Sequence, residues 1–403
     1  DCRDWMNNLK LRASYGSLGN INNVGYYDYF SNYGSVGYYP MGDLIGNSIT
    51  ESKPANPNLG WEKVTMTNFG VDFDFFNNRL SGTVEYYIKN TNDILLAYPV
   101  PTETGIAKDP SQNLGRVRNN GLEITLNHRN NIGDFTYSVG GNLTWNKNKI
   151  TKLASGDIIQ NVSGHGVGKF ILREGEAIGS FYGFKADGLY TQEDIDNGEY
   201  YKYGTVTPNA GDIKFVPNRD IKYGEAITND DRVILGQDVP KFTYGLNFNV
   251  GYKNFELTMN GQGVTGTKVA FEVYQMHPFF HGQDNPRKFH MNRWTEENPN
   301  ANAIYPRIYM ASDPHTAYNR TFSDYHLFDA DYFRIKNLTL AYLVPNAVTK
   351  NLGLSNLRVY VTGENLFTIR ADKKIKDFDP ETAGGVISAY GTKTFAFGVN
   401  VSF

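Results

Sequence analysis

Cysteine, long apolar runs and excess charge are all scarce in this 403-residue sequence, and each absence excludes a class of protein. The single cysteine, Cys2, rules out an internal disulfide framework and a cysteine-based zinc cluster. The 39 basic and 42 acidic residues leave a formal net charge of −3, whereas a nucleic-acid binder carries a clear basic excess. No apolar run approaches the roughly 18 residues that a membrane-spanning helix requires.

The start of the sequence has no signal peptide. Residues 1–4 are mostly charged, and no apolar segment follows them. If the chain is exported, we therefore expect further sequence upstream of Asp1.

Aromatic residues and glycines are abundant. Phe, Tyr and Trp make up 14% of the chain and there are 41 glycines, whereas hydrophobic residues reach only 40%. This composition is typical of a surface-exposed β protein, or of an outer-membrane barrel whose strands are apolar on alternate residues only.

Apolar and polar residues alternate over many segments. In residues 80–89 the even positions carry Leu, Gly, Val, Tyr and Ile, and the odd positions carry Ser, Thr, Glu, Tyr and Lys. Because successive side chains of a strand point to opposite faces, such a segment has one apolar and one polar face. Near Lys336 and Asn337 the apolar positions change from odd to even, and we expect a β-bulge there. The same alternation recurs at 122–127, 135–145, 242–250, 357–362 and 395–403.

The connections between the predicted strands are alternately long and short. This holds if a turn is placed at Gly175–Ala177, since treating 167–187 as one strand breaks the alternation. Outer-membrane barrels have short periplasmic turns and long external loops, so we predict an all-β fold, an antiparallel transmembrane β-barrel with about 12 strands. Both chain ends then lie on the short-turn side. The predicted strands are 8–15, 61–76, 79–96, 115–128, 133–147, 167–174, 178–187, 240–250, 254–263, 331–344, 355–367 and 392–403.

Nine sequence blocks occur in an order that is specific to one family. Together they resemble the C-terminal part of a SusC/RagA-like TonB-linked outer-membrane protein of Bacteroidetes, over nearly the whole chain. One departure is Tyr390-Gly391, where the family usually has Tyr-Pro. The blocks are LKLRASYGSLGN (9–20), 56–87, NNGLEITL (119–126), IGSFYGFKADGLY (178–190), 231–263, RWTEENPNA (293–301), ADYFRIKNLTLAYLVP (330–345), LRVYVTGENLFT (357–368) and DFDPE (377–381).

The resemblance implies a barrel of about 22 strands that is plugged by an N-terminal domain. Residues 1–403 would form the C-terminal portion of that barrel, with the plug and the TonB-contacting segments outside this chain. Such a portion has two open edges of unpaired backbone groups, which lipid does not tolerate. We therefore expect the N-terminal half of the same transporter to complete the wall.

The resemblance also implies active import across the outer membrane and no catalysis. A large nutrient, an oligosaccharide or a peptide, would be captured outside, and the TonB complex would act through the plug. A SusD-like surface lipoprotein is expected to cap the long loops 264–330 and 369–391. Outer-membrane lipid would surround the wall, and no cofactor, metal or nucleic acid is expected.

Aromatic residues in the long loops are candidate substrate contacts. Tyr and Trp present a flat apolar face with a polar tip, which suits sugar rings and peptide side chains. The alternative is packing within the loops and an aromatic girdle at the membrane surface. The predicted contacts, with the first the most favoured, are Trp294, Tyr274, Phe279, Tyr305 and Tyr309.

Three patterns imitate other chemistry. Gly261–Gly266 matches G-x-G-x-x-G but is followed by no helical pattern, so a strand leaving the membrane is the simpler interpretation. His277 and His281 have zinc-helix spacing, but Pro278 lies between them. Residues 216–231 contain Asn and Asp without the spacing of an EF-hand, so we expect a solvated acidic loop.

Three other functions stay open. A passive porin would conduct without energy from the inner membrane. A twelve-stranded outer-membrane hydrolase would need Ser, His and an orienting acid at one level of the wall, yet His128 is the only histidine inside a predicted strand and no serine lies at matching depth. A soluble adhesin sandwich would fold without detergent.

Overall fold

The computed structural model describes residues 5–21, 24, 29–42, 44–97, 103, 110–161, 169–271, 276–279, 285–374, 376, 378–381 and 391–403. Extended strands dominate these residues, as the alternating sequence pattern predicts. Within the same ranges, no helix is both long and apolar enough to cross a membrane.

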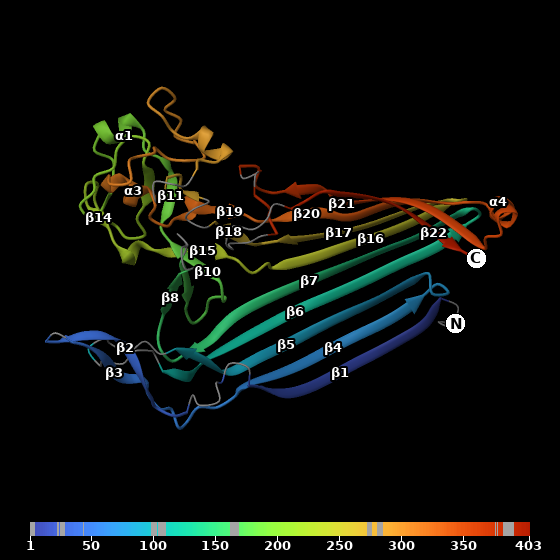
Figure 1. Ribbon diagram of the computed structural model, residues 1–403, viewed down its shortest axis with the longest axis horizontal. Coiled ribbons are helices and arrows are strands. Elements are labelled where there is room, and N and C mark those ends of the chain that lie inside the picture. Colours follow the sequence, from blue (N-terminus) through green and yellow to red (C-terminus); the bar gives the residue numbers. More distant parts are fainter. Residues whose placement is uncertain are drawn as a thin grey trace.

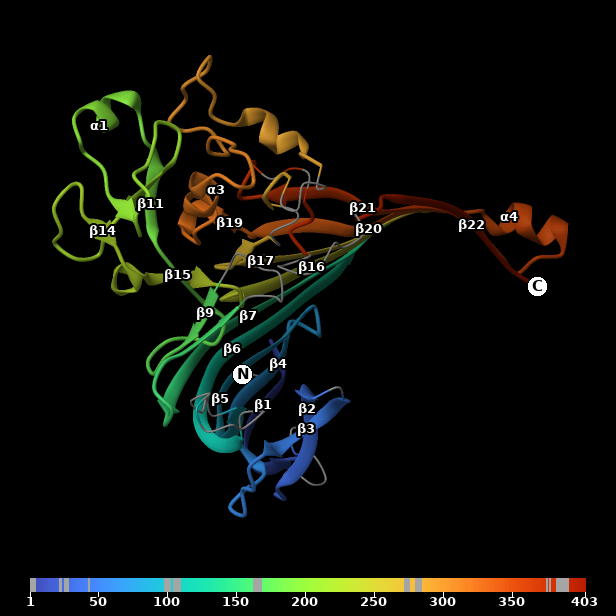
Figure 2. The same ribbon diagram turned by 60° about the vertical axis from the view of Figure 1, so that its left-hand side comes forward.

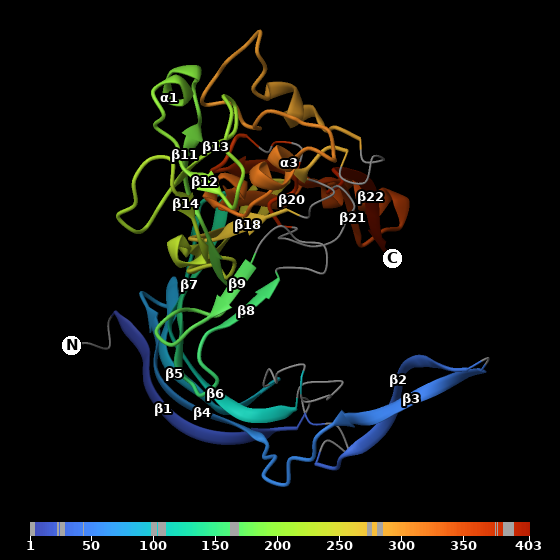
Figure 3. The same ribbon diagram turned by 90° about the vertical axis from the view of Figure 1, so that its left-hand side faces the viewer.

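One antiparallel sheet of ten strands forms most of the molecule (Figure 1). The sheet is strongly curved, as Figure 3 shows, and its two edge strands, the first and the last along the chain, do not pair with each other. The described part of the chain is therefore an open wall. In spatial order the strands are β1 (Met6–Asn20), β4 (Glu62–Phe75), β5 (Leu80–Ala97), β6 (Ser111–Ile132), β7 (Phe135–Leu153), β16 (Phe242–Tyr252), β17 (Phe255–Thr265), β20 (Tyr332–Leu343), β21 (Asn356–Arg370) and β22 (Thr394–Ser402).

The register joins the apolar sides of all ten strands into one face. A single row crosses four strands through directly opposed residues, Phe69, Tyr86, Leu122 and Trp145. Phe69 in this row is 54% exposed, and Phe397 on β22 is 84% exposed. Cross-strand pairs of this kind stabilise a sheet. The described residues do not cover this apolar face, and an exposed apolar surface of this extent requires apolar surroundings.

The connections alternate between short and long, as predicted. Short ones join β4–β5, β6–β7, β16–β17 and β20–β21 at the end of the wall where both chain termini lie (Figure 1). In the first of them Asn77 and Asn78 have φ of 57° and 59°, a region that Asn enters more readily than most residues. The β20–β21 connection contains α4 (Asn346–Thr349) and the 3-10 helix η6 (Lys350–Leu352).

The predicted count of about twelve wall strands is too high, because the described residues form a wall of ten. The segments 167–174 and 178–187 contain β9 (Lys169–Leu172), β10 (Ser180–Gly183) and the start of β11 (Lys185–Leu189), none of which joins the ten-stranded sheet. β7 pairs directly with β16. A hairpin inserted into a long loop adds one short and one long connection, so the alternation rule cannot distinguish it from two wall strands.

The predicted bulge is confirmed at Lys336. On the β17 side, Asn260 pairs with Asn337 and Gly261 with Ile335, so Lys336 has no partner. The register on the β21 side shifts at the same place. The bulge restores the apolar alternation on both sides of it.

A loop domain, defined as described residues 154–241 and 266–331, lies beyond the long-loop end of the wall (Figure 2). Its largest sheet has the order β15 (Val233–Gln237), β10, β9 and β8 (Ile158–Asn161). Two-stranded pairs are β11 with β13 (Ile213–Val216), β12 (Lys202–Tyr203) with β14 (Ala226–Ile227), and β18 (Lys268–Ala270) with β19 (Leu327–Asp329). Its short helices are α1 (Gln192–Asp196), η3 (Asn229–Asp231), η4 (Lys288–Asn292), α3 (Pro314–Asn319) and η5 (Asp324–His326), and a separate hairpin joins β2 (Asn32–Met41) to β3 (Leu44–Lys53).

The loop domain has the fully buried side chains that the wall largely lacks. One cluster packs Phe184, Phe215 and Tyr318 at 0–1% exposure. A second contains Phe271 and Phe289 of this domain, with Phe378 of the last long loop packed beside them. The domain is therefore a folded body with its own core rather than a set of independent loops.

The two faces of β6 should differ in how well they tolerate a charged side chain. Ile124→Arg puts a cation on the apolar face, where an arginine at mid-membrane costs about 2–4 kcal/mol. Its neighbour Thr125 is on the polar face, so Thr125→Arg is the matched control and should cost far less. The measurement is the amount of folded protein recovered from membranes, and equal losses for both variants would contradict this assignment of faces.

Candidate functional site

The polar face of the wall carries charges of both signs. Arg12 on β1 donates from Nε to Asp72 Oδ2 at 2.7 Å and from Nη1 to Glu85 Oε2 at 3.2 Å, so one side chain joins three strands. Thr83 adds a hydrogen bond to Asp72 Oδ1 at 3.0 Å. The pairs are accessible to water and contribute little stability, but they hold charged groups at fixed positions along the face.

Amides dominate the middle of this face. A hollow of about 560 Å³ there has a polar lining of Glu123, Thr125, Asn127, Asn142, Asn247 and Gln262. Gly140 makes room for two of these side chains, since a Cβ at this position would lie 2.1 Å from Asn247 Oδ1 and 2.3 Å from Asn127 Oδ1. Amide groups both donate and accept, so the hollow suits a hydrated, uncharged polar solute.

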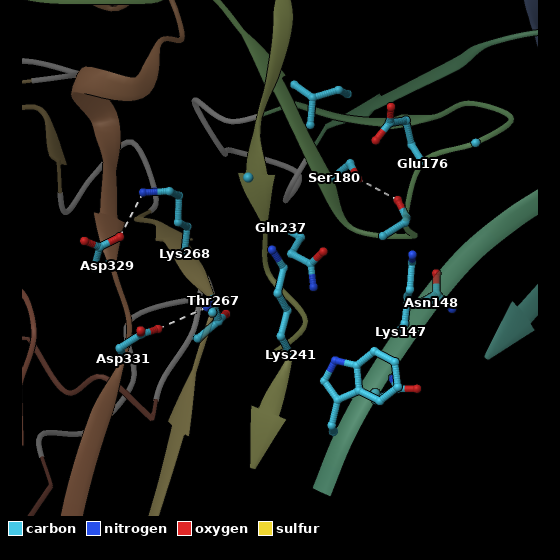
Figure 4. Close-up of a pocket in the computed structure, with 17 residues that line it drawn as sticks. Lys147, Asn148, Glu176, Ser180, Gln237, Lys241, Thr267, Lys268, Asp329 and Asp331 are labelled. Carbon is cyan, nitrogen blue, oxygen red and sulfur yellow. Dashed lines mark hydrogen bonds and ion pairs between the residues drawn. The ribbon is translucent and has the colours of Figure 1, made fainter. Parts of the chain in front are cut away.

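A second hollow, of about 570 Å³, lies where the wall meets the loop domain (Figure 4). Lys147 on β7 and Lys241 before β16 both extend along it, and Gln237 and Glu176 border it. At one side Lys268 pairs with Asp329, with 2.8 Å between Nζ and Oδ1. The hollow therefore has two lysines that form no ion pair within the described residues, and it is open to polar ligands.

A segment of the last long loop is fixed to the polar face by one arginine. Arg334 on β20 has a side chain only 5% exposed, and its guanidinium contacts Asp379 Oδ1 at 2.6 Å and Glu381 Oε2 at 2.9 Å. Phe378 stacks on Phe271 of the loop domain with 4.0 Å between ring centroids. Residues 378–381 therefore tie the wall to the loop domain. Sequence reasoning missed this anchor because nothing local links DFDPE to a residue 45 positions earlier.

Three buried histidines lie in the loop domain. Nδ1 of His277 is 2.8 Å from the Tyr305 hydroxyl, and its ring centroid is 5.5 Å from that of His326. His326 Nε2 is 3.0 Å from the Asn319 carbonyl, and His290 Nε2 is 2.9 Å from that of Met276. His277 Nε2 is buried with no hydrogen-bond partner among the described residues.

Burial keeps this histidine cluster neutral. It lowers the pKa of His326 to about 4, against the opposing effect of the Asn319 carbonyl. It also lowers the pKa of His277 well below 6.5, with further lowering from nearby His326, Arg320 and His290. Burial lowers the pKa of His290 as well. The cluster is therefore a neutral, partly hydrogen-bonded core at neutral pH.

The predicted aromatic contacts lie at different depths. Trp294 and Tyr305 are each 5% exposed and pack in the two buried clusters. Tyr309 is half-buried and stacks on His315, while Phe279 is 48% exposed. Tyr274 lies outside the described residues. Trp294 and Tyr305 thus have packing roles in this structure, whereas the side chains of Phe279 and Tyr309 are at least partly accessible to a ligand. Substrate contact stays a prediction for all five residues.

The three misleading patterns have structural explanations. Gly261 and Gly263 lie within β17, where Phe333 and Tyr244 cover them, as expected of a strand. In the 216–231 loop, Asp231 accepts from Arg219, with 2.7 Å between Nη2 and Oδ2, and also accepts from the backbone N–H of Thr228, the N-cap of η3. Of the zinc-spaced pair, His281 lies outside the described residues and His277 is in the buried cluster. Over the described ranges, no three His, Cys, Asp or Glu side chains are grouped to hold a metal ion.

Comparison with known proteins identifies the family. Residues 4–366 match the family described as TonB dependent receptor-like, beta-barrel, and the chain belongs to that family. It is 32% identical to TonB-dependent receptor P3 of Formosa agariphila over 98% of this chain and 39% of that protein. It is 28% identical to TonB-dependent receptor SusC of Bacteroides thetaiotaomicron over 99% of this chain and 38% of that protein.

A solved structure agrees with these matches. The RagAB peptide transporter superposes with a TM-score of 0.74 at 26% identity, covering 99% of this chain and 41% of that chain. The chain thus spans about two fifths of the length of these proteins. The family is one of outer-membrane receptors and transporters and is not enzymatic, so this chain is an outer-membrane protein and not an enzyme. Its apolar face is the lipid-facing one and its polar face lines the interior.

The Arg334 anchor should be far more sensitive than its exposed neighbour. Arg334→Gln removes this cation from Asp379, whose side chain is 12% exposed, and removes one of two cations from Glu381, and the loss of one partner of such a buried pair costs about 3–5 kcal/mol. Lys336, 32% exposed, contacts the same Glu381 at 2.6 Å, so Lys336→Gln is the matched control and should cost less than about 1 kcal/mol. The measurement is amide hydrogen exchange at residues 378–381, and equal protection in both variants would contradict the anchor.

The loop domain should lose stability in acid. The unfolded chain takes up protons on these histidines near pH 6.5, while folded His326 resists them until about pH 4. Stability is therefore full above about pH 6.5 and falls as pH decreases towards 4, by on the order of 3 kcal/mol for His326 alone. Hydrogen exchange of residues 314–327 at about pH 7.5 and about pH 5, corrected for intrinsic rates, measures this. His326→Asn should be less stable but less pH-dependent, and a pH-independent wild type would refute the effect.

Proposed function

We propose that this chain is the C-terminal part of the barrel wall of a SusC/RagA-type, TonB-dependent outer-membrane transporter that actively imports a large nutrient. The observation that carries the proposal is the alignment of nearly the whole chain, 98–99% of it, with about two fifths of the length of such receptors. The N-terminal half of the same transporter would supply the remaining strands and the plug, through which the TonB complex acts.

The polar face supports the import of a bulky hydrated solute. Its amides and fixed charges of both signs offer hydrogen bonds along the wall without selecting one charge sign. One similar solved structure is described as a peptide transporter. We therefore propose an oligosaccharide or a peptide as substrate, with exposed Phe279 and half-buried Tyr309 among its first contacts.

We also propose that a SusD-like surface lipoprotein covers the loop domain. The domain has its own core and is tied to the wall through residues 378–381, so it offers a stable surface for a partner. Phe279 and Met310, 48% and 81% exposed, are apolar groups on this domain suited to such a contact.

Purification of the intact receptor from native membranes tests the partner. We expect a lipoprotein to co-purify in stable ratio, and Phe279→Asp with Met310→Asp to reduce its recovery because charge is inserted into an apolar contact. Lys222→Asp on the same domain is the control. Recovery of the receptor without any lipoprotein would overturn the proposal.

Uptake by energised and de-energised cells separates active import from the alternative, a passive porin. Active import should stop when the inner-membrane gradient is collapsed, whereas diffusion through a porin would continue. Continued uptake without the gradient would therefore overturn the transport proposal and leave the wall's fold unaffected.

A further inference from the structure

Five cations occupy the long-loop ends of β6 and β7. Register places Arg118 opposite Lys149 and Arg116 opposite Lys152, with Lys147 opposite Asn120. All five cations are exposed, and none forms an ion pair with a carboxylate within the described residues. Arg118 donates to the Asn90 amide oxygen at 3.0 Å. In a chain of net charge −3, this is an unbalanced positive patch.

The patch lies on the lipid-facing side of the wall. Arg118 and Asn120 continue the row of Leu122, and Lys149 and Lys147 continue the row of Trp145. The opposite side of the same strands is filled by Val117, Ile150 and Leu153, which are 3–6% exposed and pack against Leu172 of the loop domain. The cations extend the apolar belt at its outer rim, and Lys147 also borders the hollow where the wall meets the loop domain.

A hollow of about 540 Å³ opens within the patch. Its polar lining comes from the side chains of Arg118, Asn120, Lys147, Lys149, Thr151 and Glu174, and Ile150 and Gly175 also border it. The only carboxylate among these, that of Glu174, accepts from the Leu153 amide at 2.7 Å through Oε1. The Asn120 amide oxygen is buried, and no described residue forms a hydrogen bond with it. Three cations and one amide side chain thus line the same hollow.

We infer that this hollow binds the phosphate-bearing sugar headgroup of a glycolipid in the outer leaflet of the membrane. Guanidinium and ammonium groups are the usual partners of phosphate, and three of them border this hollow. The acyl chains of the same lipid would run along the apolar belt below, over Leu122 and Trp145. The patch lies in the middle of the described wall, away from both open edges, so completion of the barrel leaves it accessible. The inference concerns the membrane around the wall and does not depend on the transported nutrient.

Binding of lipid A to the intact receptor tests the inference. The receptor is placed in nanodiscs of neutral phospholipid with lipid A that carries phosphate, and retained lipid A is measured by native mass spectrometry. Each cation at an anionic surface contributes about fivefold, so Arg118→Gln, Lys147→Gln and Lys149→Gln together should weaken retention on the order of a hundredfold. The control removes the same charge elsewhere, through Lys222→Gln, Lys350→Gln and Lys374→Gln, and should retain lipid A as the wild type does.

Two further arms distinguish the sources of phosphate. Lipid A stripped of phosphate should bind as weakly as the triple variant, and inorganic phosphate alone should not displace the intact lipid. Equal retention by the triple variant, equal binding of stripped lipid A, or displacement by inorganic phosphate would each overturn the inference. The combined variant Arg118→Lys, Lys147→Arg and Lys149→Arg keeps the charge, so it should retain lipid A. That result would exclude misfolding as the cause of the loss in the triple Gln variant.

Discussion

Pairing of the backbone groups across one continuous sheet is the constraint on which this structure depends. In a hydrocarbon surrounding, each unpaired N–H or C=O costs several kcal/mol, so a strand can cross only beside another strand. Once the ladder from β1 to β22 is complete, alternation assigns every side chain to lipid or to the interior. The apolar row from Phe69 to Trp145 and the charge network of Arg12 are the two results of that single arrangement.

The same constraint explains why folded cores are found at one end only. Wall strands have no room for a three-dimensional core, because each side faces either lipid or the interior. The loop domain lies outside the membrane and can bury Phe184, Tyr318 and the histidines in the way a soluble domain does. Polar groups in that core must then be neutral or paired, as His326 and Asp231 are.

Sequence alone could predict what depends on local period, and little that depends on distant pairing. The bulge at Lys336 and the side of the chain termini follow from alternation and loop length, and both agree with the structure. The predicted number of wall strands does not agree with the structure. β9 and β10 are apolar, as wall strands are, but they are buried within the loop domain and not placed in the wall. Trp294 illustrates the same limit, since composition marks it as a contact residue but the space beside Gly211 holds its indole in a core.

β7 is longer than β16, one of the two strands with which it pairs. It continues to Leu153, although its pairing with β16 ends at Trp145, and beyond that point the Ile150 amide and carbonyl bond to Glu176 and Gly175 at 2.8 and 2.9 Å. Beyond Trp145, residues of the loop domain thus pair with the edge of β7 that β16 leaves unpaired. Hinged motion between this domain and the wall would break those bonds, so they hold the loop domain to the rim of the wall as the ladder itself holds one strand to the next.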